Sequence, residues 1–294
     1  MKKNTMRTRS KGAKKRSKFG EIVHRLRKST PAMIALSFIL LLILCSVFAP
    51  LIAPYDYAKQ DLVNRFQMPN GAYLLGTDEF GRDILSRLIY GGRISLLVSM
   101  MAVAISVVFA LVLGATAGYF GGIYDTVIMR VLDVFMAIPG TLLTIVVAVA
   151  LGTSLLDTAI AIAVGSVPAL ARQLRASTLL IRDEEYIEAA KSFGASNFRI
   201  IRKHVLPNTL APVIVQVSLR LGESITAIAG MSFIGLGIQP PTPEWGNMLS
   251  AGQQYIRSFW PLITFPGILI GLSMLAFNLF GDGLRDAMDP RLKR

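Results

Sequence analysis

The stretch ISLLVSMMAVAISVVFALVLGATA occupies residues 94–117 and contains no charged side chain. About 20 apolar residues in a helix are enough to cross the ~30 Å hydrocarbon core of a bilayer. Similar apolar stretches occur at about 32–53, 127–151, 155–174, 210–236 and 261–280. The sequence therefore predicts an all-α integral membrane protein with six transmembrane helices, in which Pro139 and Pro168 are tolerated inside the third and fourth.

The composition agrees with this class and excludes several others. Of 294 residues, 53% are hydrophobic and 17% are charged, whereas soluble domains have about 25% charged residues. The single Cys45 rules out an internal disulfide, and two distant histidines, His24 and His204, give no zinc-site pattern. Because the first apolar run is longer than the core of a signal peptide, we expect it to be an anchor.

The net charge of +13 is concentrated beside the predicted spans. Residues 1–31, 172–208 and 282–294 hold 23 of the 31 Lys and Arg residues, whereas 54–93 and 237–260 hold six. Basic residues beside spans favour the cytoplasmic side, so both termini are expected to be cytoplasmic. Nucleic-acid binding is an alternative for the basic tail, but attraction to anionic lipid headgroups explains it more simply, and we expect no nucleic-acid partner.

These features divide the chain into four parts. Residues 1–31 form a basic tail, in which Phe19, Ile22, Val23 and Leu26 predict a short amphipathic helix that can lie on the bilayer. Residues 32–93 contain the first span and an extracytoplasmic segment. Residues 94–281 form a five-helix core that includes the loop 176–208, and residues 282–294 form the C-terminal tail.

The loop 176–208 reads ASTLLIRDEEYIEAAKSFGASNFRIIRKHVLPN. Its pattern predicts two short helices, with Gly194 in the left-handed conformation between them and Ser196 or Asn197 capping the second. Pro207 is expected to end the second helix. The apolar side chains then form a ridge on the cytoplasmic side, which suits either docking into a groove of a partner or lying on lipid.

This loop resembles the EAA motif of permease subunits of bacterial ABC importers. The matching residues are Glu188, Ala189, Ala190, Gly194, Leu206 and Pro207, while His204 stands where the motif has isoleucine. Residues 75–96, 232–249 and 280–292 resemble the dipeptide, oligopeptide and nickel branch of the family, specifically its C-type permease. The resemblance covers nearly the whole chain from about residue 31.

The resemblance implies a type I ABC importer permease of MetI-like architecture in a bacterial inner or plasma membrane. Such a subunit forms half of a pathway for di- or oligopeptides or a related small solute. It pairs with a second homologous permease, two cytoplasmic ATPases that use ATP and Mg²⁺, and an extracytoplasmic binding protein. The chain itself has no phosphate-binding loop and no nucleophile–base constellation, so we expect neither a cofactor nor enzyme activity in it.

Charges inside apolar spans usually face a bundle interior or a pathway. Arg130 with Asp133, and Arg220 with Glu223, are spaced so that each pair shares one helix face. Both pairs can be self-neutralised structural pairs. The functional interpretation is that Arg220 and Glu223 line the translocation pathway or its gate.

The segments outside the predicted core also contain candidate features. Thr77 is a suitable N-cap for a helix that includes Asp78, and Asp78, Arg82 and Asp83 suit either a metal or substrate site or, more simply, a surface helix. Trp245 and Trp260 are residues typical of the membrane interface.

Two other classes of function compete with an ABC permease. An ion-coupled secondary transporter would use the intramembrane Glu223 and Asp133, and a membrane scaffold would carry no solute. Vanadate-sensitive uptake that requires an ATPase would favour an ABC permease over a secondary transporter. Solute flux in a reconstituted complex would favour a permease over a scaffold.

Overall fold

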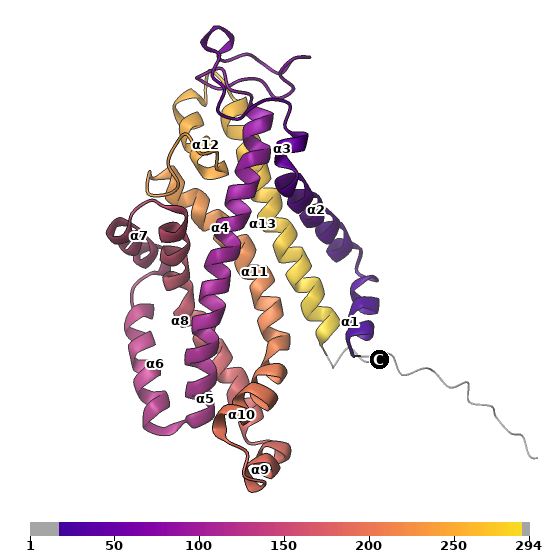
Figure 1. The fold of residues 1–294 in the computed structure, drawn as a ribbon, viewed down its shortest axis with the longest axis vertical. Helices are drawn as coiled ribbons and strands as arrows, with labels where there is room; N and C mark the ends of the chain where they lie inside the picture. The colour runs from indigo at the N-terminus through magenta and orange to yellow at the C-terminus, as the bar shows by residue number, and fades with distance from the viewer. Residues whose placement is uncertain (1–17, 290–294) are drawn as a thin grey trace, which may run out of the picture.

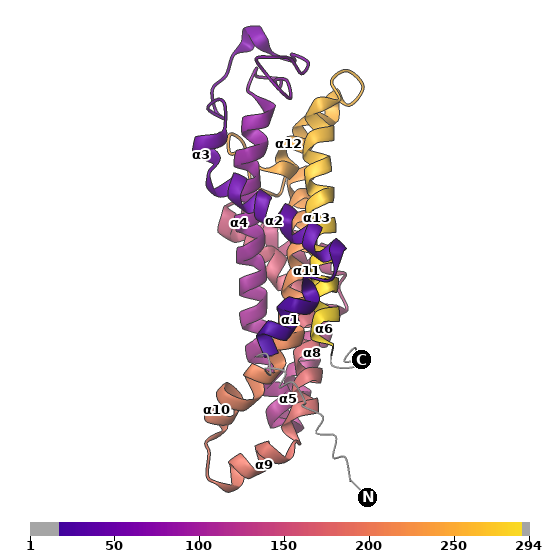
Figure 2. The ribbon, with the colours of Figure 1, turned by 90° about the vertical axis from the view of Figure 1, so that its right-hand side faces the viewer.

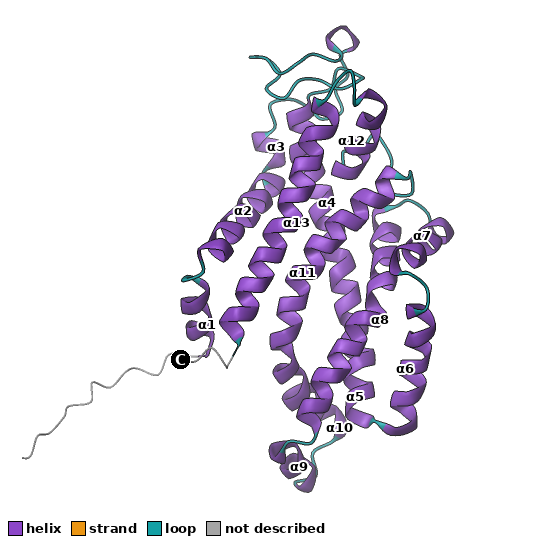
Figure 3. Ribbon diagram, turned by 180° about the vertical axis from the view of Figure 1, so that it is seen from behind, coloured by secondary structure: helices purple, strands orange, loops and turns teal. Residues whose placement is uncertain are grey.

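Residues 18–289 are described by a computed structural model in which most of the long helices run roughly along one axis (Figures 1 and 2). The long helices are α2 (Thr30–Val47), α4 (Ile84–Ala110), α6 (Gly122–Met136), α7 (Gly140–Leu151), α8 (Leu155–Arg182), α11 (Leu206–Phe233) and α13 (Pro261–Met288). The short ones are α1 (Lys18–Leu26), α3 (Ala49–Ile52), α5 (Thr116–Phe120), α9 (Glu185–Ser192), α10 (Asn197–Ile200) and α12 (Trp245–Gly252). Each regular secondary-structure element in the described part of the chain is therefore a helix, as predicted (Figure 3).

Five of these helical segments are long and apolar enough to cross a membrane, and a sixth is counted if one bent pair is a single span. The second span is the longest, because α4 continues through a π-helical turn at Leu111–Ala115 into α5, giving 37 residues from Ile84 to Phe120. Pro168 lies inside α8, as predicted.

The third predicted span is broken, which corrects the expectation that Pro139 is tolerated within it. Helices α6 and α7 meet at 87°, and Pro139 is the residue before α7 begins. Proline lacks the backbone N–H that a continuous helix requires and disfavours helical geometry in the preceding residue. Because α7 turns aside at this point, α6 stands beside α8 without a straight continuation above it (Figure 1).

Small residues hold α8 close to the helix formed by α4 and α5. A side chain on Gly114 would collide with the backbone of Ala171, and one on Gly118 would collide with Thr178. Small residues at these positions therefore permit the close approach of the two helices. The remaining main contacts join α11 to α13 and α13 to α2.

One end of the bundle, named here the cap end, is made by residues 53–83 and 234–260 (Figure 1). The predicted N-cap is wrong, because α4 begins at Ile84 and Asp83 caps it by accepting a hydrogen bond from the Ser86 amide at 2.7 Å. Thr77 instead donates to the Asn64 carbonyl at 2.5 Å and accepts from the Gln67 amide at 2.9 Å. Its hydroxyl is thus used to join two loop segments.

Trp245 is buried rather than placed at the membrane interface, which corrects a second prediction. Its ring packs against Gly91 and Gly92 of α4, and its Nε1–H donates to the Leu88 carbonyl at 2.9 Å. The neighbouring Glu244 is also buried and accepts hydrogen bonds from Ser95 Oγ at 2.9 Å and from two amides at the start of α12. The loop before α12 is therefore fixed to α4 from within the bundle.

The predicted amphipathic helix is present as α1, although nothing is described of the side chain of Phe19. It packs beside the end of α13, where Arg25 donates to the Asp289 carbonyl at 3.2 Å. Gly283 of α13 leaves room for Ala32 at the start of α2. Residues 1–17, which hold most of the predicted basic tail, and residues 290–294 lie outside the described part of the chain.

Candidate functional site

Helices α9 and α10 form a hairpin at the end of the bundle opposite the cap end (Figures 1 and 2). Gly194 follows the last residues of α9 with φ of +76°, and Ser196 caps α10 by accepting from the Arg199 amide at 3.4 Å. Both features agree with the prediction from sequence. A left-handed residue between two short helices reverses the chain, and glycine is the residue that adopts it at the least cost.

The hairpin is fixed to the bundle through a small apolar cluster, named here the hairpin root. Ile187, Ile200 and Val205 are buried there against Tyr119 of α5. The Tyr119 hydroxyl donates to Asn197 Oδ1 at 3.0 Å, and the Lys191 ammonium lies 5.5 Å from the Tyr119 ring centre. The hairpin is thus supported on the final turn of the longest helical segment.

The tip of the hairpin, in contrast, is exposed. Glu188, Ala189 and Gly194 lie on the surface, and Ala190 is half-buried. Phe193 and Phe198 are 91% and 71% exposed. Exposed aromatic side chains on a loop that is held rigidly at its root are typical of a docking surface.

Leu206 and Pro207 begin α11, so Pro207 does not end a helix as predicted. The chain remains helical from α10 through a π-helical turn at Ile201–Val205 into α11. Pro207 lies just after this π-helical turn, where the backbone hydrogen-bond spacing changes from that of the π-helix to that of α11. The hairpin is therefore continuous with the fifth predicted span.

Tyr186 of α9 contacts two side chains, one in the π-helical turn before α11 and one in the first turn of α11. Asn208 Nδ2 donates to the Tyr186 hydroxyl at 3.4 Å, and the His204 ring lies 6.2 Å from that of Tyr186. Partial burial, followed by the charge of Glu184, raises the pKa of Tyr186. His204, where the sequence departs from the EAA pattern, is thus one of these two contacts.

A basic surface lies beside the hairpin root. Arg199, Arg202 and Lys203 line a shallow hollow of about 750 Å³ together with Ser196, Phe198 and Pro207. The three cations border the exposed Phe198, so any partner that covers this ring also meets a positive surface.

The charged pairs within the apolar helices are present, with one correction. Arg220 Nη1 lies 2.9 Å from Glu223 Oε2, as the spacing predicted. Arg130 lies 3.8 Å from Asp133, but Asp133 makes its closer ion pair with Arg172 of α8. Helix spacing shows only partners on the same helix, so it could not reveal this pairing.

A second pairing between helices was missed for the same reason. Arg175 of α8 makes two hydrogen bonds of 2.5 Å to the carboxylate of Asp125 on α6. Together with Arg172 and Asp133, this pair joins α6 to α8. The sequence did contain one signal for these pairings. Asp125 and Asp133 lie in or beside the third apolar stretch, and Arg172 and Arg175 lie at the end of the fourth.

The candidate metal or substrate site at the cap end is an internal ion pair. Asp78 Oδ2 accepts from Arg82 Nε at 2.6 Å, and both side chains are buried. Burial, followed by the charge of Asp78, raises the pKa of the adjacent Glu79. Among the residues that the structure describes, no group of three or more His, Cys, Asp or Glu is arranged to hold a metal ion.

Comparison with known families gives two matches. Residues 110–294 match the model of the binding-protein-dependent transport system inner membrane component. Residues 17–69 match the N-terminal transmembrane domain of oligopeptide transport permease C.

Curated relatives match over almost the entire chain. A dipeptide transport system permease protein of Alkalihalophilus pseudofirmus is 45% identical over 94% of this chain and 91% of its own length. The dipeptide transport permease of Haemophilus influenzae is 44% identical over 91% and 93%, and a glutathione transport system permease of Escherichia coli is 43% identical over 95% and 92%.

A solved structure shares the fold. The inward-facing MetNI methionine ABC transporter has a chain with a TM-score of 0.54 and 21% identity, covering 69% of this chain and 97% of that chain. The match supports the predicted MetI-like architecture. The long family match, the near full-length relatives and the apolar spans therefore agree, and the chain belongs to the family of multi-pass inner-membrane components of binding-protein-dependent transport systems, as a transport permease subunit and not an enzyme.

Proposed function

We propose that this chain forms one half of the transmembrane pathway of an ABC importer for dipeptides or closely related small peptides. The substrate class is supported by the names of its near full-length relatives, which transport dipeptides, di- and tripeptides, or glutathione. The observation that carries the coupling role is the hairpin, which is buried at its root and exposed at its tip.

The hairpin tip is proposed to dock into a cytoplasmic ATPase. Glu188 supplies a polar contact, Ala189 and Ala190 permit close approach, and Gly194 sets the chain reversal. Leu206 and Pro207 connect the hairpin directly to α11, so movement of the hairpin is transmitted to a membrane span. This arrangement suits rigid-body coupling through a packed root.

The proposed orientation places the hairpin and both termini in the cytoplasm. Basic residues concentrate in those segments, and α1, the end of α13 and the hairpin lie toward the same end of the bundle (Figure 1). The cap end then faces an extracytoplasmic binding protein. A second homologous permease completes the pathway, two ATPases supply ATP hydrolysis with Mg²⁺, and this chain needs no cofactor of its own.

Arg220 and Glu223 are proposed to line the pathway. Glu223 is 55% exposed in this single chain although it stands within a candidate span. A charge in this position requires a polar surrounding, which a pathway between two permeases provides.

The coupling role is tested with two substitutions at Gly194. A Cβ atom at this position would have no other atom within 4 Å, so the requirement is the φ of +76° and not space within this chain. Valine rarely adopts this conformation, whereas asparagine does so readily. We expect Gly194→Val to abolish peptide uptake while the protein remains in the membrane, and Gly194→Asn to retain it.

Uptake is measured in vesicles that contain the complete transporter. Normal uptake by Gly194→Val would overturn the coupling role. Vanadate-insensitive uptake in the absence of any ATPase would instead support a secondary transporter.

A further inference from the structure

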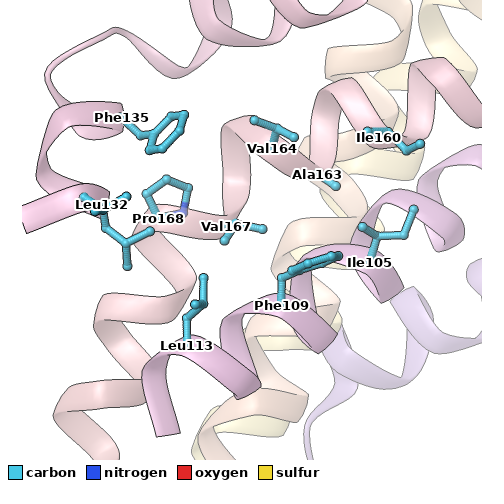
Figure 4. A pocket seen from close by; sticks show the side chains of 11 residues that line it. Ile105, Phe109, Leu113, Leu132, Phe135, Ile160, Ala163, Val164, Val167 and Pro168 are labelled. Atoms are coloured by element: carbon cyan, nitrogen blue, oxygen red, sulfur yellow. The ribbon is translucent and has the colours of Figure 1, made fainter. Parts of the chain in front are cut away.

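A cavity of about 380 Å³ lies between α4, α6 and α8, beside the break that separates α6 from α7 (Figure 4). All eleven of its lining side chains are apolar, and they include Phe109, Phe135, Val164 and Val167. Figure 4 shows the Phe135 ring on one side of the cavity and the two valines of α8 on another. Its volume is near the lower limit for ligand pockets, about 300–1,000 Å³, which suits one apolar group and not a whole peptide.

Charged side chains stand at one edge of this cavity. Pro168 lines it, and Arg172 is one helical turn further along the same face of α8. Leu132 lines it from α6, and Asp133 is the next residue. Asp133 is shared by Arg172 and, at 3.8 Å, by Arg130.

These charged side chains indicate what kind of molecule can occupy the cavity. The side chains of Arg130, Arg172 and Asp133 are 80%, 48% and 40% exposed in the single chain, although they stand on helices of candidate spans. Charges of this kind face polar surroundings and not lipid tails. The cavity therefore has one polar edge, and a lipid acyl chain is the less suitable occupant.

The balance of charge also favours an anionic group. Two arginines share the single carboxylate of Asp133, so this trio has a net charge of +1. A free C-terminal carboxylate complements it, because guanidinium groups bind carboxylates with directed hydrogen bonds.

We propose that the cavity receives an apolar side chain of the transported peptide while Arg130 and Arg172 bind the peptide carboxylate. This inference rests on the proposed peptide transport and makes the permease itself selective for side-chain type. Peptides with apolar side chains gain a contact in the cavity that glycine peptides cannot make. Burial of a few methylene groups is enough to change selectivity by about tenfold or more.

The experiment compares uptake of Leu-Leu and Gly-Gly by the complete transporter in vesicles. Val164→Phe fills the cavity with a larger apolar side chain. We expect Leu-Leu uptake, measured as kcat/KM, to fall about tenfold, while Gly-Gly uptake stays within about twofold of the wild type. Val149→Phe is the matched control, because Val149 is on α7, exposed, and outside the cavity lining, and it should leave the ratio unchanged.

A second arm tests the carboxylate. Arg172→Gln should raise the KM for Leu-Leu. The wild-type transporter should take up C-terminally amidated Leu-Leu only weakly, and Arg172→Gln should not weaken that uptake further. If Val164→Phe does not reach the membrane, Val167→Phe fills the same cavity and replaces it in the comparison.

The outcomes separate this inference from the function on which it rests. Equal loss of both dipeptides in the valine variants, as expected if the cavity holds lipid or is structural, overturns the cavity assignment alone. An unchanged Leu-Leu to Gly-Gly ratio does the same. A wild-type transporter that imports neither dipeptide overturns the proposed function itself.

Discussion

The loop around Trp245 at the cap end and the tip of the hairpin at the other end differ in how their large side chains are held. At the cap end, Trp245 and Glu244 are each 1% exposed, and their polar atoms bind groups on α4. At the hairpin end, Phe193 and Phe198 stand in solvent while only the root is packed. A segment whose buried polar groups are hydrogen-bonded within the chain is stable without a partner. Exposed aromatic rings, in contrast, are removed from water only when a partner covers them. The contrast separates a loop that is packed within the chain from the surface proposed for docking.

The largest effect is expected for Trp245→Ala at the cap end. The substitution removes an indole that is packed against Gly91 and Gly92, and with it the hydrogen bond that Nε1–H donates to the Leu88 carbonyl. We expect a loss of about 3–5 kcal/mol in the free energy of unfolding, the range for large aromatic truncations in cores. Thermal unfolding in detergent measures it. Trp260→Ala, at a half-exposed tryptophan, serves as the control. If both variants lost the same free energy of unfolding, burial of Trp245 would not explain the stability of the cap end.

A smaller loss is expected for Glu244→Gln. The carboxylate accepts from Ser95 Oγ and from the amides of Gly246 and Asn247, and a glutamine amide nitrogen cannot accept in its place. Because hydrogen bonds to charged groups contribute about 1.5–3 kcal/mol, we expect a loss within that range. The same unfolding measurement detects it. An unchanged melting temperature would show that the cap end does not depend on this carboxylate.

The smallest effect on stability is expected for Phe193→Ala at the hairpin tip. The side chain packs little within this chain, so the free energy of unfolding should change by less than about 0.5 kcal/mol. Peptide uptake should nevertheless fall strongly, because the ring is lost from the proposed docking surface. Val63→Ala, which alters an equally exposed residue of the cap end, should leave uptake unchanged. A folded Phe193→Ala variant with full uptake would contradict docking at the tip.

The features predicted correctly from sequence are those set by local chemistry. Gly194 has a positive φ and Ser196 caps α10, since chain reversal and capping depend on a few adjacent residues. The spans could be located because their apolar composition is itself the signal.

The features that sequence did not predict depend on distant partners. Trp245 is buried only because Gly91 and Gly92, about 150 positions earlier, leave room for its ring. Asp133 pairs with Arg172 across two helices, and no spacing rule connects positions so far apart. The bend at Pro139 was missed because hydropathy measures how apolar a segment is and not whether its helix is continuous.

The helical segment Ile84–Phe120 touches both ends of the molecule. Its first turns hold the loop around Trp245, and its last turn holds the hairpin root through Tyr119. At 1.5 Å per residue, 37 residues measure about 55 Å. A tilt of about 5° around the midpoint of such a rod displaces each end by roughly 2 Å, in opposite directions. In the proposed coupling, the segment would therefore act as a lever arm that transmits a push on the hairpin directly to the cap end.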